Sequence, residues 1–200
     1  VVDDGFSYNF TSNQETVAAG ARLWVDGGSL TGTQTFRFNG SAETDGAFDF
    51  TGGAYRDTFI GGAGADTFEG GLQRDFLTGG AGADTFIYGG SIESRWGTRD
   101  EITDFNTAAD TFQLDVGVTA VDPTVSGSVS TIADLAALAT SGNFGASHAL
   151  LVNVTGGTLN GHTLLLVDAS NAAGLQSTDY VIDVTGIAGT LTVADFILGG

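Results

Sequence analysis

The stretch GGAGADTFEGGLQRDFLTGGAGADTFIYGG, residues 61–90, repeats one small pattern at intervals of nine residues. Aspartates stand at Asp57, Asp66, Asp75 and Asp84, each with a glycine pair shortly before it and a large apolar residue two positions after it. A helix needs an apolar residue every three or four positions, and each interior glycine costs it about 1 kcal/mol. The nine-residue unit therefore predicts a six-residue turn followed by a three-residue strand.

Two such units make one coil of a flattened parallel solenoid, in which successive coils stack at roughly 4.8 Å. The apolar residue of each unit faces inward, so the spacing predicts that Phe59 lies against Leu77 and Phe68 against Phe86. We therefore expect an all-β fold, a parallel β-roll (β-solenoid) flanked by antiparallel strands and one short helix.

The aspartates of alternate turns lie on opposite edges of this solenoid, Asp57 with Asp75 and Asp66 with Asp84. Carboxylates about 5 Å apart repel each other by about 3 kcal/mol at an effective dielectric constant near 20. Calcium accepts six to eight oxygen ligands, including backbone carbonyls, and glycine lets a turn present its carbonyls. The spacing thus predicts Ca²⁺-binding turns. The alternative is a solvated aspartate that caps its own turn.

The composition limits the functions that the chain can have. It has 24 acidic and 6 basic residues, a formal charge of -18, which excludes nucleic acid and anionic membranes as partners. A hydrophobic content of 42% with 14 phenylalanines is enough for a folded core, and the absence of cysteine excludes disulfides and thiolate metal sites. No apolar run reaches 18 residues, so we expect no membrane insertion.

The chain divides into three predicted parts. Residues 1–39 read as a strand-rich N-terminal flank, residues 40–118 as the calcium-binding roll, and residues 119–200 as a C-terminal β-rich cap. We read GSAETDGAF, residues 40–48, as a degenerate earlier coil. In the cap, residues 130–140 predict a short helix with a capping box, and HALLVNV, HTLLLVD and DYVIDV predict strands.

The repeat resembles the RTX nonapeptide G-G-x-G-x-D-x-U-x, in which U is a large apolar residue and the repeats form a calcium-binding β-helix. The units GGAGADTFE (61–69) and GGAGADTFI (79–87) match it fully. The units GGAYRDTFI (52–60) and GGLQRDFLT (70–78) keep the glycine pair and the aspartate. Four units in register make the resemblance specific.

Residues 84–115 resemble the C-terminal region of serralysin-type secreted metalloproteases. The resemblance implies ligand positions at Asp100, Asp104 and Asp110, with a structural role in the loop as the alternative. The ending LTVADFILGG resembles the C-termini of that family, which close on an acidic residue and an apolar triplet, here Asp195 to Leu198. Such ends are read by a type I secretion apparatus, and the absence of an initiator Met favours the C-terminal part of a longer exported protein.

The candidate calcium ligands are aspartates together with the turn residues that supply carbonyls. They are Asp57, Gly61, Gly62, Ala63, Gly64, Asp66, Asp75, Gly79, Gly80, Ala81, Gly82, Asp84, Asp100, Asp104 and Asp110. Arg56 and Arg74 stand one coil apart beside Asp57 and Asp75, which predicts weaker calcium binding on that edge unless they turn outward to carboxylates such as Glu69.

The sequence predicts a non-catalytic, secreted calcium-binding module that folds outside the cell and supports type I secretion of a larger bacterial protein. It contains no H-E-x-x-H and no G-x-S-x-G motif, and His148 and His162 read as isolated histidines. Two alternatives stay open. The chain is a structural segment of a surface layer or adhesin, with self-association, or it is the C-terminal domain of an enzyme whose active site lies upstream.

Overall fold

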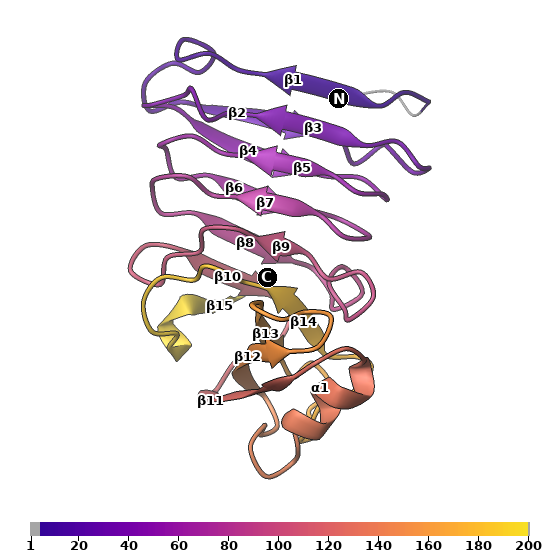
Figure 1. The fold of residues 1–200 in the computed structure, drawn as a ribbon. Helices are drawn as coiled ribbons and strands as arrows, with labels where there is room; N and C mark the ends of the chain where they lie inside the picture. The colour runs from indigo at the N-terminus through magenta and orange to yellow at the C-terminus, as the bar shows by residue number, and fades with distance from the viewer. Residues whose placement is uncertain (1–4, 200) are drawn as a thin grey trace.

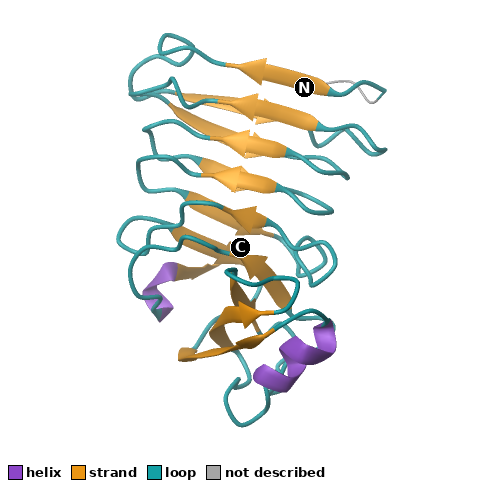
Figure 2. Ribbon diagram, in the orientation of Figure 1, coloured by secondary structure: helices purple, strands orange, loops and turns teal. Residues whose placement is uncertain are grey.

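The computed structural model describes residues 5–199, so residues 1–4 of the predicted flank and the last glycine, Gly200, lie outside the described residues. Figure 1 shows strands that stack like rungs, from the N-terminal end down to a compact C-terminal part that carries helix α1 (Ile132–Leu138). Strands and loops make up the whole stack, and helix occurs only toward the C-terminus (Figure 2). The expected all-β parallel roll with one short helix is confirmed.

The strands form two sheets. Within the described residues, sheet A has the spatial order β1 (Tyr8–Thr11), β3 (Phe36–Asn39), β5 (Thr58–Ile60), β7 (Phe76–Thr78), β9 (Glu101–Ile102), β14 (Tyr180–Asp183), β13 (Thr163–Val167), β12 (His148–Gly156) and β11 (Ala120–Ser128). Sheet B has the order β15 (Phe196–Leu198), β10 (Thr111–Leu114), β8 (Thr85–Tyr88), β6 (Thr67–Glu69), β4 (Ala47–Thr51) and β2 (Arg22–Asp26).

The turns between the two sheets form two edges. The Asp57 edge consists of the turns at residues 27–35, 52–57, 70–75 and 89–100. The Asp66 edge, on the left in Figure 1, consists of the turns at residues 12–21, 40–46, 61–66, 79–84 and 103–110. Alternate aspartates therefore do lie on opposite edges, as the period of nine predicts.

The register of the central coils follows the 18-residue step. Phe59 pairs with Leu77 and Phe68 with Phe86 in parallel, so both expected contacts are confirmed. The rings of Phe50 and Phe68 stack at 5.0 Å, and those of Phe68 and Phe86 at 5.1 Å. Burial of this inward-facing column supplies the core of the roll, since burying a large apolar side chain contributes about 1.5–3 kcal/mol.

The N-terminal strands join the same stack. Strand β1 pairs in parallel with β3, and β2 with β4, so parallel pairing continues on both sides of residue 39. Residues 40–46 form the turn, and β4 the strand, of the coil above β6, in which Phe50 pairs with Phe68. Phe48 is two positions earlier, and its N–H donates to Asp66 Oδ1 at 2.7 Å.

The C-terminal part supplies the antiparallel strands. Strands β12, β13 and β14 pair antiparallel, and β14 continues sheet A through β9. Thr131 caps α1 in the predicted capping box with Asp134. Pro123 lies in β11 where the register against β12 shifts, because proline cannot donate a ladder hydrogen bond.

The end of the chain closes sheet B. Strand β15 pairs in parallel with β10, and the ring of Phe196 stacks on that of Phe112 at 5.7 Å. Asp195 is buried, and its carboxylate accepts from the N–H of Thr192 at 2.5 Å. The acidic residue and apolar triplet noted in the sequence thus form the last turn and strand of the roll.

Candidate metal centre

Each edge of the roll carries a column of buried carboxylates. Asp57, Asp75 and Asp100 lie on the Asp57 edge, each with 0% exposure, so none is a solvated turn aspartate. Asp75 Oδ1 accepts from Asp57 N at 2.7 Å, and Asp100 Oδ1 from Asp75 N at 2.8 Å. Each carboxylate therefore reaches back to the backbone of the preceding coil.

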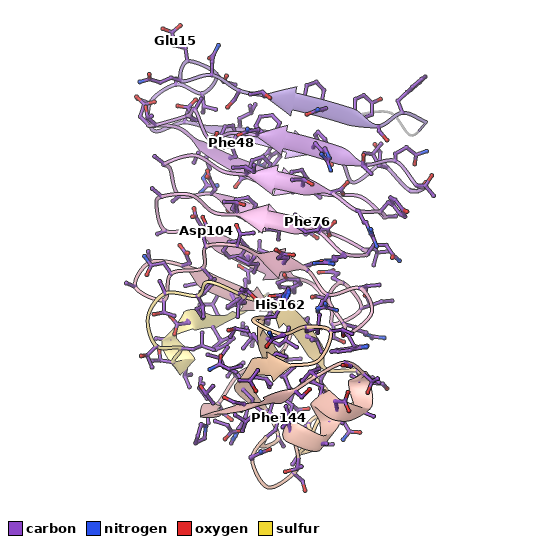
Figure 3. All side chains as sticks on the ribbon, in the orientation of Figure 1. Glu15, Phe48, Phe76, Asp104, Phe144 and His162 are labelled. Atoms are coloured by element: carbon purple, nitrogen blue, oxygen red, sulfur yellow. The ribbon has the colours of Figure 1, made fainter. Side chains whose placement is uncertain are left out.

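The Asp66 edge repeats this arrangement. Asp84 Oδ1 accepts from Asp66 N at 2.8 Å, and Asp110 Oδ1 from Asp84 N at 3.0 Å. Asp104 is outside the column. Its two oxygens accept from Gly79 N and Gly80 N, both at 2.8 Å, and it is partly exposed at the left edge in Figure 3. The structure thus brings Asp100 and Asp110 into the columns and leaves Asp104 beside the turn at residues 79–84.

The second carboxylate oxygens divide the aspartates into two groups. In Asp57, Asp66 and Asp110, Oδ2 accepts a backbone N–H from its own turn, at 2.6, 2.8 and 2.8 Å. In Asp75, Asp84 and Asp100, Oδ2 is buried and makes no hydrogen bond among the described residues, although burial, which raises the pKa of Asp100, is partly opposed by the nearby Tyr88 hydroxyl. A buried charged oxygen without a partner is costly, so these three atoms suit coordination of a cation.

The electrostatics agree with this assignment. Burial raises the pKa of Asp57 and of Asp66 to about 6, and that of Asp84 to about 7. Burial, followed by the charge of Asp100, raises the pKa of Asp75 well above its ordinary value. Each raised pKa means that the folded chain alone disfavours the charged carboxylate, whereas a nearby cation reverses that preference.

The glycine pair is required by the carboxylate that follows it. A Cβ on Gly79 would lie 2.4 Å from Asp84 Oδ2, and one on Gly61 would lie 2.2 Å from Asp66 Oδ2. A Cβ on Gly82 would lie 2.2 Å from the carbonyl oxygen of Gly64, one coil away. Side chains are thus excluded where carboxylates and carbonyl oxygens crowd together between coils.

The donor set is mainly backbone. In residues 5–199, no three carboxylate or imidazole side chains converge on one point. Any ion between the turns must therefore take most of its ligands from carbonyl oxygens, which suits calcium and does not suit zinc. His148 contacts Asp122 at 3.0 Å and His162 contacts Asp183 at 2.5 Å, each through Nδ1.

The arginines beside the Asp57 column are partly or fully exposed, but the charge of Arg74 still reaches it: burial raises the pKa of Asp100, and Arg74 acts to lower it. Arg74 pairs with Glu101 at 2.7 Å and stacks on the ring of Phe76, 4.9 Å from its centroid. The partner is Glu101 rather than Glu69, because Glu101 lies opposite Phe76 in the neighbouring strand β9 of sheet A, whereas Glu69 lies in sheet B. Arg56 is exposed, one coil above Arg74.

What ends the two columns could not be predicted from the sequence. Phe36 and Phe48 occupy the aspartate position in the coils above Asp57 and Asp66, and donate their N–H groups to them at 2.7 Å. Glu43 is also buried and accepts from Val17 N at 2.9 Å. The N-terminal coils are therefore joined by aromatic packing and one carboxylate. The spacing of these coils follows no regular period, so the sequence does not reveal this ending.

A parallel β-roll with buried carboxylates stacked over glycine turns belongs to the class of calcium-binding solenoids. Residues 51–86 match the family model of the RTX calcium-binding nonapeptide repeat, in four copies. The chain therefore carries RTX repeats, which bind calcium ions, occur in secreted proteins and are themselves non-catalytic. A search of curated proteins finds no match. In the described part of the chain, no helix has the length and hydropathy to span a membrane.

Proposed function

We propose that this chain is a calcium-dependent folding module of a larger exported bacterial protein. The observation that carries the proposal is the set of buried, unpartnered Oδ2 atoms of Asp75, Asp84 and Asp100. They leave the coils joined by hydrogen bonds but electrostatically unbalanced. A divalent cation supplies the missing positive charge and a ligand acceptor for these oxygens.

The proposed ligands are the two aspartate columns and the turn carbonyls between them. On the Asp66 edge they comprise Asp66, Asp84, Asp110 and the carbonyls of residues 61–64 and 79–82, with Asp104 beside them. On the Asp57 edge they comprise Asp57, Asp75 and Asp100. The ion pair of Arg74 with Glu101, which partly neutralises the arginine, supports calcium on this second edge.

The proposed switch follows from mass action. Where calcium is scarce, the charged carboxylates oppose the stacking of coils and the chain stays unfolded. Extracellular calcium sites have dissociation constants of about 0.1–1 mM, so millimolar calcium fills them. Binding to the folded state alone stabilises it by RT ln(1 + [L]/Kd) per site, and adjacent sites share a turn, which makes folding cooperative.

Export of the parent protein is the proposed purpose of this switch. A chain that stays unfolded inside the cell can pass a type I secretion apparatus, and folding outside opposes its return. Support comes from the RTX repeats and from the C-terminal resemblance at Asp195 to Leu198. We accordingly propose an extracellular or cell-surface location, with residues 1–39, 40–118 and 119–200 as flank, roll and cap. The parent's activity lies upstream if the parent is an enzyme.

A structural role in a surface layer or adhesin is the second candidate. Strands β1 and β2 end sheets A and B, and no other described strand pairs with their outer edges. Open strand edges can accept another strand. Calcium-dependent growth of light scattering by the isolated chain would favour this role over the secretion module.

Circular dichroism during titration with calcium, and separately with magnesium, tests the proposal. We expect a mostly disordered spectrum without calcium and a cooperative rise of β-structure with calcium. Magnesium should be far less effective, because it demands near-octahedral geometry and retains its waters. A full β-spectrum in chelator at neutral pH, unchanged by calcium, would refute the switch.

A further inference from the structure

An exposed tryptophan lies on the outer face of sheet B, outside both carboxylate columns, although its neighbours Arg22 and Asp49 lie near Asp66. Trp24, in the middle of β2, is 80% exposed and makes no ring-to-ring contact with another described aromatic residue. It lies opposite Asp49 of β4, and its Nε1–H donates to Asp49 Oδ2 at 2.6 Å. The indole is therefore held in one orientation while its faces remain in water.

The surroundings of this ring are polar and already organised. A hollow of about 260 Å³ is lined by Trp24, Asp26, Asp49 and Thr51. Arg22 forms an ion pair with Asp49, and its Nη2 donates to the carbonyl of Ala65 at 2.6 Å. Gly28 N donates to Asp26 Oδ1 at 2.8 Å. Each carboxylate thus keeps a fixed position beside the ring.

We propose that this hollow binds an uncharged carbohydrate, stacked on Trp24 and hydrogen-bonded by Asp26, Asp49 and Thr51. A sugar ring has an apolar face of C–H groups that packs on an aromatic face, and hydroxyl groups around its rim. Carboxylates and a threonine hydroxyl accept hydrogen bonds from such hydroxyls, and binding sites commonly combine an aromatic wall with a few polar groups.

The local charge narrows the ligand class. Asp26 and Asp49 outnumber Arg22, and the whole chain carries a net charge of -18, so an anionic ligand is repelled. A purely apolar protein segment would leave the carboxylates buried without hydrogen-bond donors. A cationic ligand is also disfavoured, because Trp24 offers one aromatic ring rather than a cage of several and because Arg22 already neutralises Asp49.

Affinity electrophoresis with calcium present provides the test. The gels contain neutral polysaccharides of glucose, mannose or galactose in α or β linkage, an acidic polysaccharide, or no sugar. We expect at least one neutral polysaccharide to retard the chain and the acidic one to leave it unaffected. Trp24→Ala should weaken that binding at least tenfold, and Trp24→Phe should retain part of it.

Two further variants separate the site from general effects. Asp49→Ala frees the indole and should weaken binding by an intermediate factor. Ile92→Ala, at a residue 59% exposed in the turn at 89–100, should bind as the parent chain does. Because Trp24 is exposed, Trp24→Ala should keep the thermal midpoint with calcium, which excludes misfolding as the cause of lost binding.

Three results would overturn the proposal. The first is retardation by none of the neutral polysaccharides. The second is equal retardation of the parent chain and Trp24→Ala. The third is quenching of Trp24 fluorescence by spermine without binding of any neutral sugar, which would assign the hollow to cations. None of these results bears on the calcium sites, since calcium is present throughout.

Discussion

At the scale of single residues, the aspartate of each repeat has two separate tasks. One oxygen accepts a backbone N–H from the coil above, as Asp84 Oδ1 does from Asp66 N at 2.8 Å. The other oxygen is left without a protein partner in Asp75, Asp84 and Asp100. The first contact sets the register of the turn, and the second oxygen is available to an ion.

Substitution Asp84→Asn should have opposite effects with and without calcium. With calcium, the loss of a charged ligand should raise the calcium concentration at the folding midpoint about tenfold, which corresponds to about 1.4 kcal/mol. Without calcium, removal of a buried charge should stabilise the fold. Calcium titrations followed by circular dichroism measure the first effect, and the β-signal that each chain retains in chelator at neutral pH measures the second.

The matched control for this prediction is Asp45→Asn, at an exposed aspartate two turns above on the same edge. It should leave the calcium midpoint and the β-signal in chelator unchanged. A lower stability of Asp84→Asn in both conditions would show a purely structural carboxylate and contradict the assignment.

Substitution Gly79→Ala tests why the glycine pair precedes the aspartate. The added methyl group would meet Asp84 Oδ2 at 2.4 Å, so either the carboxylate or the turn must move. We expect a cost of about 1–3 kcal/mol, typical of overpacking. Urea unfolding at saturating calcium measures it, and Gly117→Ala, where nothing lies within 4 Å, serves as the control. Equal stability of the two variants would be inconsistent with this crowding.

At the scale of the elements, the three-residue strands are too short to be stable individually. They persist because each carries one inward residue into a continuous column, in which Phe50, Phe68 and Phe86 stack with ring centroids 5.0 and 5.1 Å apart. Each strand is stable only when it packs between two neighbouring strands, so the stability of the roll comes from the whole column and not from any one strand.

Substitution Phe68→Ala should remove a link in this column at a cost of about 3–5 kcal/mol even with calcium bound. Phe68 is 0% exposed, whereas Phe6 is 70% exposed and supplies the control Phe6→Ala, for which we expect a change within about 0.5 kcal/mol. Urea unfolding with calcium present gives both values. Similar losses for the two variants would place the stability of the roll elsewhere.

The sequence predicts these elements where their spacing is regular. The 18-residue step fixes Phe59 against Leu77 and Phe68 against Phe86, and Thr131 with Asp134 fixes the start of α1. Above them, the distance from Tyr8 to its partner Phe36 is 28 residues and that from Arg37 to its partner Thr58 is 21, so no period reveals the parallel pairing. Turn length, which follows no sequence repeat there, decides that register.

The site could be predicted only in part for the same reason. Asp57, Asp66, Asp75 and Asp84 follow from the period of nine, and the C-terminal resemblance adds Asp100 and Asp110. The unequal satisfaction of their oxygens could not be predicted. It depends on whether a backbone N–H of the turn points at Oδ2, as Gly53 N does toward Asp57, and sequence spacing carries no information about that.

At the scale of the whole molecule, the roll is continuous, but the interactions that join its coils change along its length. Carboxylate columns join the coils from Asp57 and Asp66 downward, and aromatic residues join those above. The C-terminal strand β15 returns to pair with β10, so the end of the chain stabilises a coil formed some 80 residues earlier. Removal of calcium should therefore affect the chain as one unit.

Acidification should partly replace calcium. The folded pKa values of Asp57, Asp66 and Asp84, about 6, 6 and 7, lie above the ordinary value of 3.8. Between the ordinary value and the folded values, the folded chain binds more protons than the unfolded chain. The free energy of unfolding therefore rises as pH falls, and this gain is complete below about pH 4. In buffer freed of calcium by chelating resin, β-structure should increase from pH 8 to pH 5.

With calcium present the same titration should act on folding in the same direction, because between pH 8 and 6 only the folded calcium-free state gains protons while the unfolded carboxylates stay ionised. The calcium concentration at the folding midpoint should fall as pH falls from 8 to 6, although protons weaken the binding of calcium to chains that are already folded. A midpoint independent of pH in this range, together with an unchanged calcium-free spectrum, would mean that these carboxylates do not control folding.

The 18-residue step that pairs β5 with β7 and β6 with β8 also bears on how such a chain can change over generations. An in-frame duplication of residues 61–78 would insert one more coil and leave the pairing on either side unaltered. Deletion of the same segment would shorten the molecule in the same way. The number of coils and the number of calcium sites can thus change together in a single genetic event, without any new interface between coils.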